Sequence, residues 1–406
     1  MALDIMPPMR RLIPFAFVFA LLVTAIPQAA FAEPQADDTP ICLPSPFAAL
    51  PDDCMPYGPS AYLDHAARQG IQFPMAPLPA TPIDQSLSDL NINYATVSTV
   101  SGEQIVERPF FTTLDDAVAY LNPAGYMKYG TSSQYVSYSS VQEVNGTNYY
   151  LTENGWMRRT DLSPAQVRRF SIGMEFEATP ALPFGWVLEY ANAETAPFRG
   201  WQDGSISAPR TEATYEAYSL LQVYDIREEG DLTWYLVGPD AWLNSLQMRL
   251  VFPTSEAPEG VENGRWIEIN LEQQTFAVYE NNQMVFATMV ATGLDNLWTR
   301  PGLFQVYEKH ETTTMSGDFS GGTGGYYYLA DVPWAMYYDE ARAIHGAYWR
   351  PKQFFGYQGS HGCVNLAIGD AHWMYTWAQV GDWVFVHDPS GRTPTDEEFS
   401  YGPGAP

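Results

Sequence analysis

The chain is poor in cysteine and in positive charge. Its 406 residues hold 3 cysteines, and 20 Lys and Arg against 47 Asp and Glu give a net charge of −27. A chain this acidic is repelled by phosphate backbones and by anionic membrane surfaces, which argues against nucleic acid as a partner. We interpret the charge mainly as a source of solubility, with a basic substrate as the second interpretation.

Long apolar runs are also scarce, and only the N-terminus holds one. Arg10 and Arg11 precede an apolar run over 12–26, and Ala30-Phe31-Ala32 offers a small-x-small cleavage site. This pattern is typical of a secretory signal peptide, so we expect residues 1–32 to direct export to the periplasm or extracellular cell wall. The run is short for a membrane span. The alternative to a cleaved signal is an uncleaved anchor, which is the sole membrane contact expected.

The few cysteines divide into a pair and a single residue. Cys42 and Cys54 can form a disulfide that closes a short loop in an oxidising compartment, or both stay free. In either case Cys363 is left over. An unpaired thiol in an exported protein is a candidate reactive group.

Metal and phosphate signatures are missing. The Cys and His spacings match neither paired CxxC units nor HExxH, so we expect no metal site. A glycine-rich segment at 312–325 lacks Gly-Lys-Ser/Thr, which excludes a phosphate loop. This segment is interpreted either as a mobile lid over a cleft or as a plain flexible hairpin.

The run Ser360-His361-Gly362-Cys363-Val364-Asn365 holds the parts that thiol catalysis needs, with His345 and Gly346 upstream. A thiolate attacks carbonyls, and an imidazole can take the thiol proton and return it to a leaving amine. A glycine before the nucleophile lets backbone N–H groups turn toward a developing oxyanion. The alternative is a buried structural cysteine, but the order of residues favours catalysis.

This pattern resembles the L,D-transpeptidases, whose catalytic domain is called YkuD. The family motif is His-Gly/Ser, a gap, then Ser/Thr-His-Gly-Cys-hydrophobic-Asn/Arg, and the resemblance covers residues 265–388. Other matching segments are the opening hairpin and the helix and strand after the nucleophile: 266–271, 276–279, 292–293, 299–304, 370–375 and 381–384.

The resemblance implies a role for each residue of the motif. Cys363 is the nucleophile, His345 the general base, and the Gly346 carbonyl holds the imidazole in its useful tautomer. The backbone N–H groups of His361, Gly362 and Cys363 are the implied oxyanion donors.

Ser360 and Asn365 either hold the nucleophile loop by hydrogen bonds or contact substrate. Ala347 departs from the family, which often has Ser or Thr there. We expect changed substrate contacts from this departure and no loss of the chemistry.

A tyrosine is also implied at the oxyanion site, six residues before a tryptophan on the strand that precedes the base histidine. Counting back from Trp334 gives Tyr328, although Tyr326 and Tyr327 are adjacent and leave the register open. Trp334 itself lines the acyl-donor groove or sits in the core.

The implied reaction is acyl transfer on peptidoglycan stem peptides, which builds 3→3 crosslinks and serves cell-wall organisation. It needs no metal or organic cofactor, and carbapenem-type β-lactams are implied inhibitors that acylate Cys363. Two alternatives stay open: an L,D-carboxypeptidase in which water replaces the acceptor amine, and a non-enzymatic wall-binding protein.

The whole chain is predicted to be mainly β, with a β-sandwich catalytic domain behind small modules. The expected order of parts after the signal is a Pro-rich linker with the disulfide, two β modules, the catalytic domain and a disordered tail: 33–90, 91–170, 171–254, 265–388 and 389–406.

Local signals place several elements. Thr113 is a capping residue for a short helix to 121, and Asn145-Gly146 marks a tight hairpin turn. Ser163-Pro164 is expected to open a second short helix to about 170. Catalytic-domain strands are predicted at 266–271, 275–279 and 284–291.

Two segments, 149–162 and 234–246, each suggest a strand, a turn and a strand carrying a tryptophan. They resemble the closing hairpin of SH3-like barrels in wall-associated proteins. Their aromatic residues are interpreted either as stacking on wall sugars or peptide, or as filling small β cores.

Overall fold

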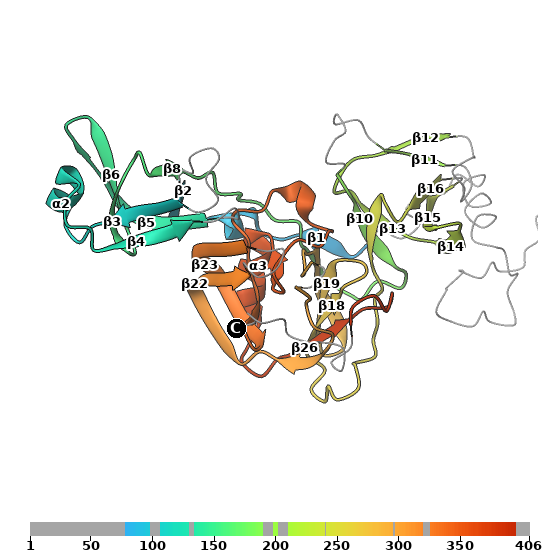
Figure 1. Ribbon diagram of the computed structural model, residues 1–406. Coiled ribbons are helices and arrows are strands. Elements are labelled where there is room, and N and C mark those ends of the chain that lie inside the picture. The colour runs from blue at the N-terminus through green and yellow to red at the C-terminus, as the bar shows by residue number, and fades with distance from the viewer. Residues whose placement is uncertain are drawn as a thin grey trace, which may run out of the picture. The chain divides into compact units, whose positions relative to one another are not determined.

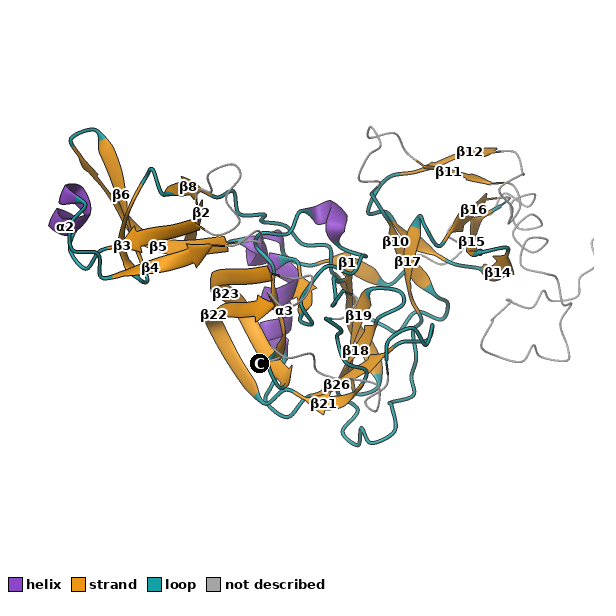
Figure 2. Cartoon of the chain, viewed as in Figure 1, coloured by secondary structure: helices purple, strands orange, loops and turns teal. Residues whose placement is uncertain are grey.

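The computed structural model describes residues 78–97, 106–129, 134–189, 198–201, 210–239, 241–294, 297–319 and 325–394. The expected signal, Cys42 and Cys54 lie outside these ranges. Within them the chain is mainly β, as the sequence predicted, and its α-helices are α2 (Leu114–Ala119) and α3 (Ile368–Trp377) (Figure 2). No helix in the described ranges is long and apolar enough to cross a membrane.

One 7-stranded sheet carries the strands predicted for the start of the catalytic domain (Figure 1). Its strands pair antiparallel except for the parallel pair of β18 with β26. In sheet order the strands are β1 (Ala80–Pro82), β9 (Met174–Phe176), β20 (Gln283–Met289), β19 (Thr275–Glu280), β18 (Trp266–Asn270), β26 (Trp383–His387) and β21 (Gly302–Gln305). The predictions of strands that correspond to β18, β19 and β20 are confirmed.

A second, 9-stranded sheet continues from the catalytic strands into the N-terminal part of the chain. β23 pairs in parallel with β5, with Tyr328 opposite Gln134 and Leu329 opposite Tyr135. The path of the sheet is β25 (Val364–Leu366), β24 (Arg342–Gly346), β23 (Gly325–Asp339), β5 (Gln134–Val144), β2 (Asn93–Val97) and β8 (Leu162–Pro164). Off this path lie β22 (Glu308–Phe319) on β23, β6 (Thr147–Thr152) on β5, and β7 (Gly155–Arg158) on β6.

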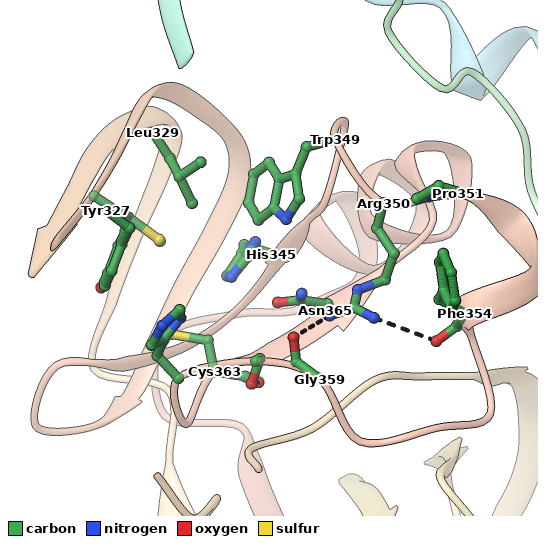
Figure 3. A pocket seen from close by; sticks show the side chains of 13 residues that line it. Tyr327, Leu329, His345, Trp349, Arg350, Pro351, Phe354, Gly359, Cys363 and Asn365 are labelled. Atoms are coloured by element: carbon green, nitrogen blue, oxygen red, sulfur yellow. Dashed lines mark hydrogen bonds between the residues drawn. The ribbon is translucent and has the colours of Figure 1, made fainter. Parts of the chain in front are cut away.

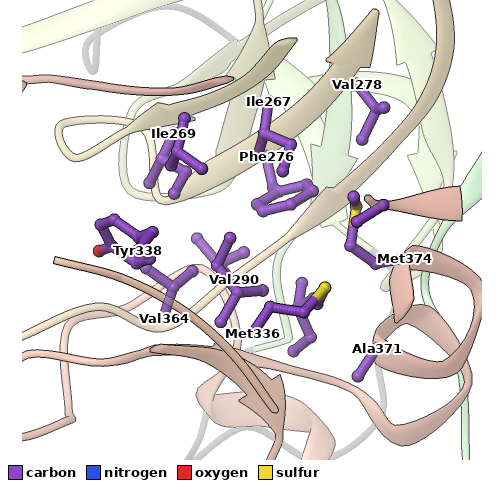
Figure 4. Close-up of a cluster of buried hydrophobic side chains, with 14 of the residues drawn as sticks. Ile267, Ile269, Phe276, Val278, Val290, Met336, Tyr338, Val364, Ala371 and Met374 are labelled. Carbon is purple, nitrogen blue, oxygen red and sulfur yellow. The ribbon is translucent and has the colours of Figure 1, made fainter. Parts of the chain in front are cut away.

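The two sheets and α3 enclose one hydrophobic core (Figure 4). Alternate side chains of each strand point inward, and burying each large apolar side chain contributes about 1.5–3 kcal/mol. The core takes residues from both sheets and from α3: Ile267, Ile269, Phe276, Val278, Met336, Tyr338, Ile344, Val364, Ala371 and Met374.

A buried carboxylate ties three parts of this domain together. Asp370, on α3, accepts hydrogen bonds from the backbone N–H of Ile172 (3.1 Å) and Gly173 (2.9 Å) and from the Thr288 hydroxyl (2.6 Å). Burial raises its pKa to about 6, against the effect of these donors. The segment before β9 is therefore held to α3 and β20 through one side chain.

The first module, residues 91–170, confirms two local predictions. Thr113 caps α2 by accepting a hydrogen bond from the Asp116 N–H at 3.1 Å. Asn145 and Gly146, with φ of 50° and 77°, form the turn of the hairpin of β5 with β6. Next to it, β3 (Val106–Phe110) and β4 (Gly125–Tyr129) form a two-stranded sheet.

The helix predicted after Ser163 is wrong. Residues 162–164 form β8, which pairs with β2, and the Ala165 N–H then bonds the Tyr94 carbonyl at 2.9 Å. Sheet pairing satisfies these backbone groups in an extended conformation, and this outweighs the local preference for a helix start.

The second module, residues 184–251, holds two further sheets. The 3-stranded sheet has the order β13 (Leu220–Gln222), β10 (Phe184–Val187) and β17 (Met248–Val251). The 5-stranded sheet has the order β12 (Arg210–Tyr215), β11 (Phe198–Trp201), β16 (Ala241–Asn244), β15 (Leu232–Gly238) and β14 (Asp225–Glu229).

All the aromatic residues of the two look-alike segments except the half-buried Trp156 fill β cores. Tyr149 and Tyr150 are buried in the first module, and Trp234, Tyr235 and Trp242 are buried in the second. Buried rings cannot stack on sugars, so the structure favours the core interpretation for them. The likeness to SH3 barrels stays a prediction.

Three predicted boundaries need correction. Residues 80–82 form β1 and 85–88 form the 3₁₀ helix η1 (Gln85–Ser88), which packs on α3, so the end of the expected linker belongs to the catalytic region. β9 places 174–176 there as well. The start of the expected tail is ordered, since the Asp388 carboxylate accepts hydrogen bonds from Ser390 and Thr393.

Candidate active site

Strand pairing brings Cys363 and His345 onto one face of a sheet. β24 and β25 run parallel with His345 opposite Asn365. Residues two apart on a strand share a face, so Cys363, Asn365 and His345 project the same way. They line a cavity of about 250 Å³ (Figure 3). Its full lining is Met315, Tyr327, Leu329, His345, Trp349, Arg350, Pro351, Phe354, Gly359, Ser360, His361, Cys363 and Asn365.

His345 is buried, with 2% of its surface exposed, and its Nδ1 lies 3.3 Å from the Gly346 carbonyl oxygen. That contact favours the tautomer with a proton on Nδ1, which leaves Nε2 as the acceptor. Burial lowers the pKa of His345 to about 4; the Gly346 carbonyl opposes this shift and the Arg350 cation adds to it. The imidazole is therefore neutral near pH 7 and able to take a proton.

The Cys363 side chain is only partly exposed, and its Sγ lies 3.9 Å from the Ala341 carbonyl oxygen. Burial raises the pKa of the thiol, while the Ala343 backbone and the Arg342 cation act in the opposite direction. The resting site thus holds a neutral thiol near a neutral imidazole. Such a pair needs proton transfer to accompany attack, in place of a preformed thiolate.

The loop before Cys363 is fixed by hydrogen bonds within itself. The Ser360 hydroxyl donates to the Cys363 carbonyl (2.5 Å) and accepts from the Gly362 N–H (3.2 Å). The Thr299 hydroxyl donates to the Gly362 carbonyl at 2.8 Å. Gly362 has a φ of 117°, and a Cβ there would lie 3.3 Å from Arg342 Nε, so glycine suits this position. Ser360 thus holds the loop in its conformation by hydrogen bonds.

The part of the chain that forms the cavity matches a known protein family. The family model of the L,D-transpeptidase catalytic domain, YkuD, matches residues 264–386. Residues 264–386 are a YkuD-type L,D-transpeptidase catalytic domain.

Individual relatives resemble about a third of the chain. L,D-transpeptidase 1 of Mycobacterium tuberculosis is 26% identical over 148 residues, 34% of this chain and 57% of that protein. The NMR structure of the catalytic domain from E. faecium L,D-transpeptidase is 28% identical, with a TM-score of 0.28, and covers 32% of this chain and 100% of that domain. The same domain acylated by ertapenem is 27% identical, with a TM-score of 0.28 and the same coverage. This chain spans little more than half the length of its M. tuberculosis relative.

The tyrosine in the YkuD cavity is Tyr327, and the prediction of Tyr328 needs correction. Tyr327 lines the cavity and stacks on His361, with ring centroids 4.7 Å apart. The Tyr328 hydroxyl donates to Glu153 and accepts from Asn154 Nδ2 at 3.3 Å, both in the first module. A slip of one residue along a strand exchanges its two faces, so counting from the tryptophan gave the wrong neighbour.

The reason for the slip is a distortion in β23. Asp331 and Trp334 have φ of 44° and 59°, and the register of β23 with β22 shifts between Thr313 and Met315. Trp334 does not line the cavity; its ring stacks on His372 at 4.0 Å beside the domain core. The core alternative for Trp334 is the one that the structure supports.

The glycine-rich segment forms the hairpin of β22 with β23, and residues 320–324 lie outside the described ranges. Met315, Tyr327 and Leu329 from this hairpin form one wall of the cavity. The placement fits both the lid and the plain hairpin. Elsewhere in the described ranges, no group of three or more His, Cys, Asp and Glu is arranged to hold a metal.

Sequence reasoning missed Trp349 and Arg350. The Trp349 ring lies 5.7 Å from that of His345. Arg350 is buried, donating from Nη1 to the Phe354 carbonyl (3.3 Å) and from Nη2 to the Gly359 carbonyl. Burial lowers its pKa to about 10, so it stays charged at neutral pH. No local signal marks an arginine as buried when the loop that covers it is irregular.

The first module supports the distorted part of β23 from behind. Tyr94 stacks on Tyr348 with ring centroids 3.8 Å apart. Their hydroxyls donate to consecutive carbonyls, Tyr94 to Asp331 (2.7 Å) and Tyr348 to Ala330 (2.8 Å). Since Tyr348 directly precedes Trp349, this aromatic pair connects the first module to the cavity wall.

Proposed function

We propose that the protein is a peptidoglycan L,D-transpeptidase that forms 3→3 crosslinks through an acyl-enzyme on Cys363. The observation that carries the proposal is the neutral His345, oriented by the Gly346 carbonyl and facing the same cavity as the thiol. The match of residues 264–386 to the transpeptidase domain supports the same reaction class.

The first half-reaction transfers the donor stem to the enzyme. Cys363 Sγ bonds to the carbonyl carbon of the third residue of a tetrapeptide stem while its proton passes to His345 Nε2. Collapse of the tetrahedral intermediate breaks the bond to the terminal D-alanine. His345 gives its proton to the departing amine, which leaves a thioester and restores the neutral imidazole.

The second half-reaction uses the same groups in reverse order. The side-chain amine of the third residue on a neighbouring stem attacks the thioester carbon. His345 takes the amine proton and returns it to Sγ as the carbon–sulfur bond breaks. The products are a new amide crosslink and the free thiol.

The loop at 360–363 is the proposed oxyanion site. Backbone N–H groups of His361, Gly362 and Cys363 are the candidate donors, and the hydrogen bonds that fix this loop would keep such donors in place before the reaction. The Gly362 N–H faces the Ser360 hydroxyl at rest, so it would have to exchange that partner for the oxyanion. The Asn365 side chain lines the cavity beside them as a substrate contact.

The remaining functional proposals follow from this chemistry. Peptidoglycan lies outside the cytoplasmic membrane, so the enzyme works after export by the segment 1–32. A strained β-lactam carbonyl offers the same electrophile as the stem, and we therefore expect carbapenems to acylate Cys363.

Product analysis tests the reaction. Purified protein is incubated with stem tetrapeptide, and the products are separated and weighed. We expect free D-alanine and a crosslinked dimer, and neither product from Cys363→Ala. Tripeptide without dimer would replace the transpeptidase proposal by the carboxypeptidase. A folded wild type that releases no D-alanine would contradict both.

A further inference from the structure

Arg350 is a buried cation in the cavity wall without an acidic partner among the described residues. It is 9% exposed, and its protein acceptors are two carbonyls, of Phe354 and Gly359. A guanidinium has five N–H donors, so three of them find no acceptor among the residues that the structure describes, and the fully buried Nε is one of these. The fold thus removes the Arg350 charge from water without placing an opposite charge beside it among the described residues.

Such an arrangement is costly by itself. Taking an ion out of water costs several kcal/mol unless an opposite charge or a full set of hydrogen bonds replaces the solvent. When the group borders a ligand cavity, the missing partner can be supplied by the ligand. Arginine suits a carboxylate in particular, because its planar fork can donate two parallel hydrogen bonds.

The simplest alternative is that Arg350 only holds the loop at 351–359. Arg249 already does this from the other side: its Nε donates to the Gly356 carbonyl at 2.7 Å, and its Nη1 donates to Ser245 and Met248 carbonyls. Arg249 does not line the cavity. The two arginines thus share a loop and differ in access to the site, which makes Arg249 a matched control.

The position of Arg350 fits a ligand that also reaches Cys363. Figure 3 shows its guanidinium beside Gly359 and Asn365, on the opposite side of His345 from Tyr327. A Cβ on Gly359 would come within 2.8 Å of both Nη1 and Nη2, so this glycine lets the guanidinium lie against the backbone. One extended peptide could thus touch both Cys363 and Arg350.

We propose that Arg350 binds a carboxylate of the acyl donor and selects donors that carry it. This inference rests on the proposed function. Two carboxylates of a stem tetrapeptide lie near the scissile bond: the terminal carboxylate of the departing residue, and the side-chain carboxylate of a third-residue diamino acid. The shared chemistry is a carboxylate next to the attacked carbonyl.

Three synthetic donors distinguish the sources. The first is a tetrapeptide with both carboxylates, the second has a C-terminal amide, and the third has lysine at position three and so lacks the side-chain carboxylate. The rate of Cys363 acylation by each donor is followed by intact mass. Hydrogen bonds to charged groups are worth about 1.5–3 kcal/mol, so we expect wild type to prefer the first donor by about 10- to 100-fold over one of the other two.

Variants test whether Arg350 is the cause. In Arg350→Gln, which keeps an amide donor and loses the charge, the preference should fall to about one. Arg350→Lys keeps the charge and should retain part of it. Arg249→Gln should keep the wild-type preference even if it weakens the loop. Thermal melting of each variant checks that it folds.

The outcomes separate the two claims. Equal acylation of wild type by all three donors would overturn the inference and leave the proposed function standing. So would Arg350→Gln slowing all donors by the same factor, because a loop clamp has no preference among carboxylates. Absence of an acyl-enzyme from every donor would overturn the proposed function and this inference with it.

Discussion

The first and second modules are both small β structures, yet they meet the YkuD domain in different ways. The first shares a sheet with it through β5 and β23, and Tyr94 reaches the carbonyl of Asp331. The second keeps its own sheets and contacts the domain at its other sheet, where the Thr275 hydroxyl donates to the Leu250 carbonyl at 2.9 Å. It also contacts the loop at 351–359, where Arg249 Nε donates to the Gly356 carbonyl. The first module is built into the strand that forms the cavity wall, and the second is attached to the opposite sheet and, through Arg249, to that loop.

This difference predicts whether a change in each module affects only stability or also catalysis at the cavity. Asp331 and Trp334 have positive φ values, and such conformations cost about 1–3 kcal/mol each and persist only where the surrounding structure fixes them. Tyr94 and Tyr348 donate to the carbonyls of Asp331 and Ala330, respectively, a few residues from Tyr327 in the cavity. Damage to the first module should therefore alter both stability and catalysis, and damage to the second module away from Arg249 should alter stability alone.

The largest effect is expected from Tyr94→Ala, in β2 of the first module. Tyr94 is 1% exposed, stacks on Tyr348 and donates to the Asp331 carbonyl. Removing a buried aromatic ring costs about 3–5 kcal/mol. Acylation of Cys363 should also slow by about tenfold or more, since β23 and the Trp349 loop lose their support. Urea unfolding and the rate of carbapenem acylation measure the two effects, and an unchanged rate would break the comparison.

Trp242→Ala makes the matching change in the second module. Trp242 is 1% exposed, and the Arg227 guanidinium carbon lies 4.5 Å from the centroid of the Trp242 ring. We expect a loss of about 3 kcal/mol in the unfolding free energy. The acylation rate should stay within about twofold of wild type, because distant sites act independently. A rate that falls as far as in Tyr94→Ala would show that both modules control the cavity.

Asp370→Asn tests the connection between α3 and the segment before β9. The Asp370 carboxyl has a pKa of about 6, above its usual 3.8, so between these pH values the native state binds more protons than the unfolded state. Stability from this group is then greatest below about pH 4 and is lost as pH rises to 6, by up to about 3 kcal/mol.

Urea unfolding at pH 4, 5 and 7 measures this effect as a difference between proteins. Wild type should lose stability over that interval relative to Asp370→Asn, in which the group no longer titrates. If the difference between the two proteins does not change with pH, the carboxylate does not titrate in this range.

The smallest effect is expected where the first module touches the hairpin at its surface. The Glu153 carboxylate accepts from the Tyr328 hydroxyl and from the Thr314 hydroxyl, the latter at 3.1 Å. Glu153→Gln should cost about 1 kcal/mol and slow acylation about twofold. Asp225→Asn, which removes the Arg227 contact in the second module, is the control and should leave the acylation rate unchanged. Equal rates for both variants would mean that this contact does not position the hairpin.

Local chemistry made much of the fold predictable. The Thr113 cap, the Asn145–Gly146 turn and the alternation in β18, β19 and β20 each depend on neighbours in the sequence, and each is confirmed. The His345 and Cys363 pair could be proposed because the order of residues around them matches the motif, and the parallel pairing of β24 with β25 brings the two residues onto one face.

Long-range pairing explains what the sequence did not reveal. β1 pairs with β9, and β9 pairs with β20, each across nearly 100 residues or more, so the end of the expected linker is a strand. Because β23 is distorted, Tyr327 lines the cavity in place of the predicted Tyr328. No residue type in the sequence indicates that distortion. Arg350 is buried by a loop without periodicity, and only the folded chain shows the cavity it borders.

The central claim is that Cys363 is an acyl-accepting thiol served by His345. Intact-mass analysis after incubation with a carbapenem tests it most directly, with Cys363→Ala in parallel. We predict one adduct with the mass of the inhibitor on wild type, none on Cys363→Ala, and formation slowed by about 100-fold or more in His345→Gln. No adduct on a folded wild type, or an adduct that persists in Cys363→Ala, would contradict the account.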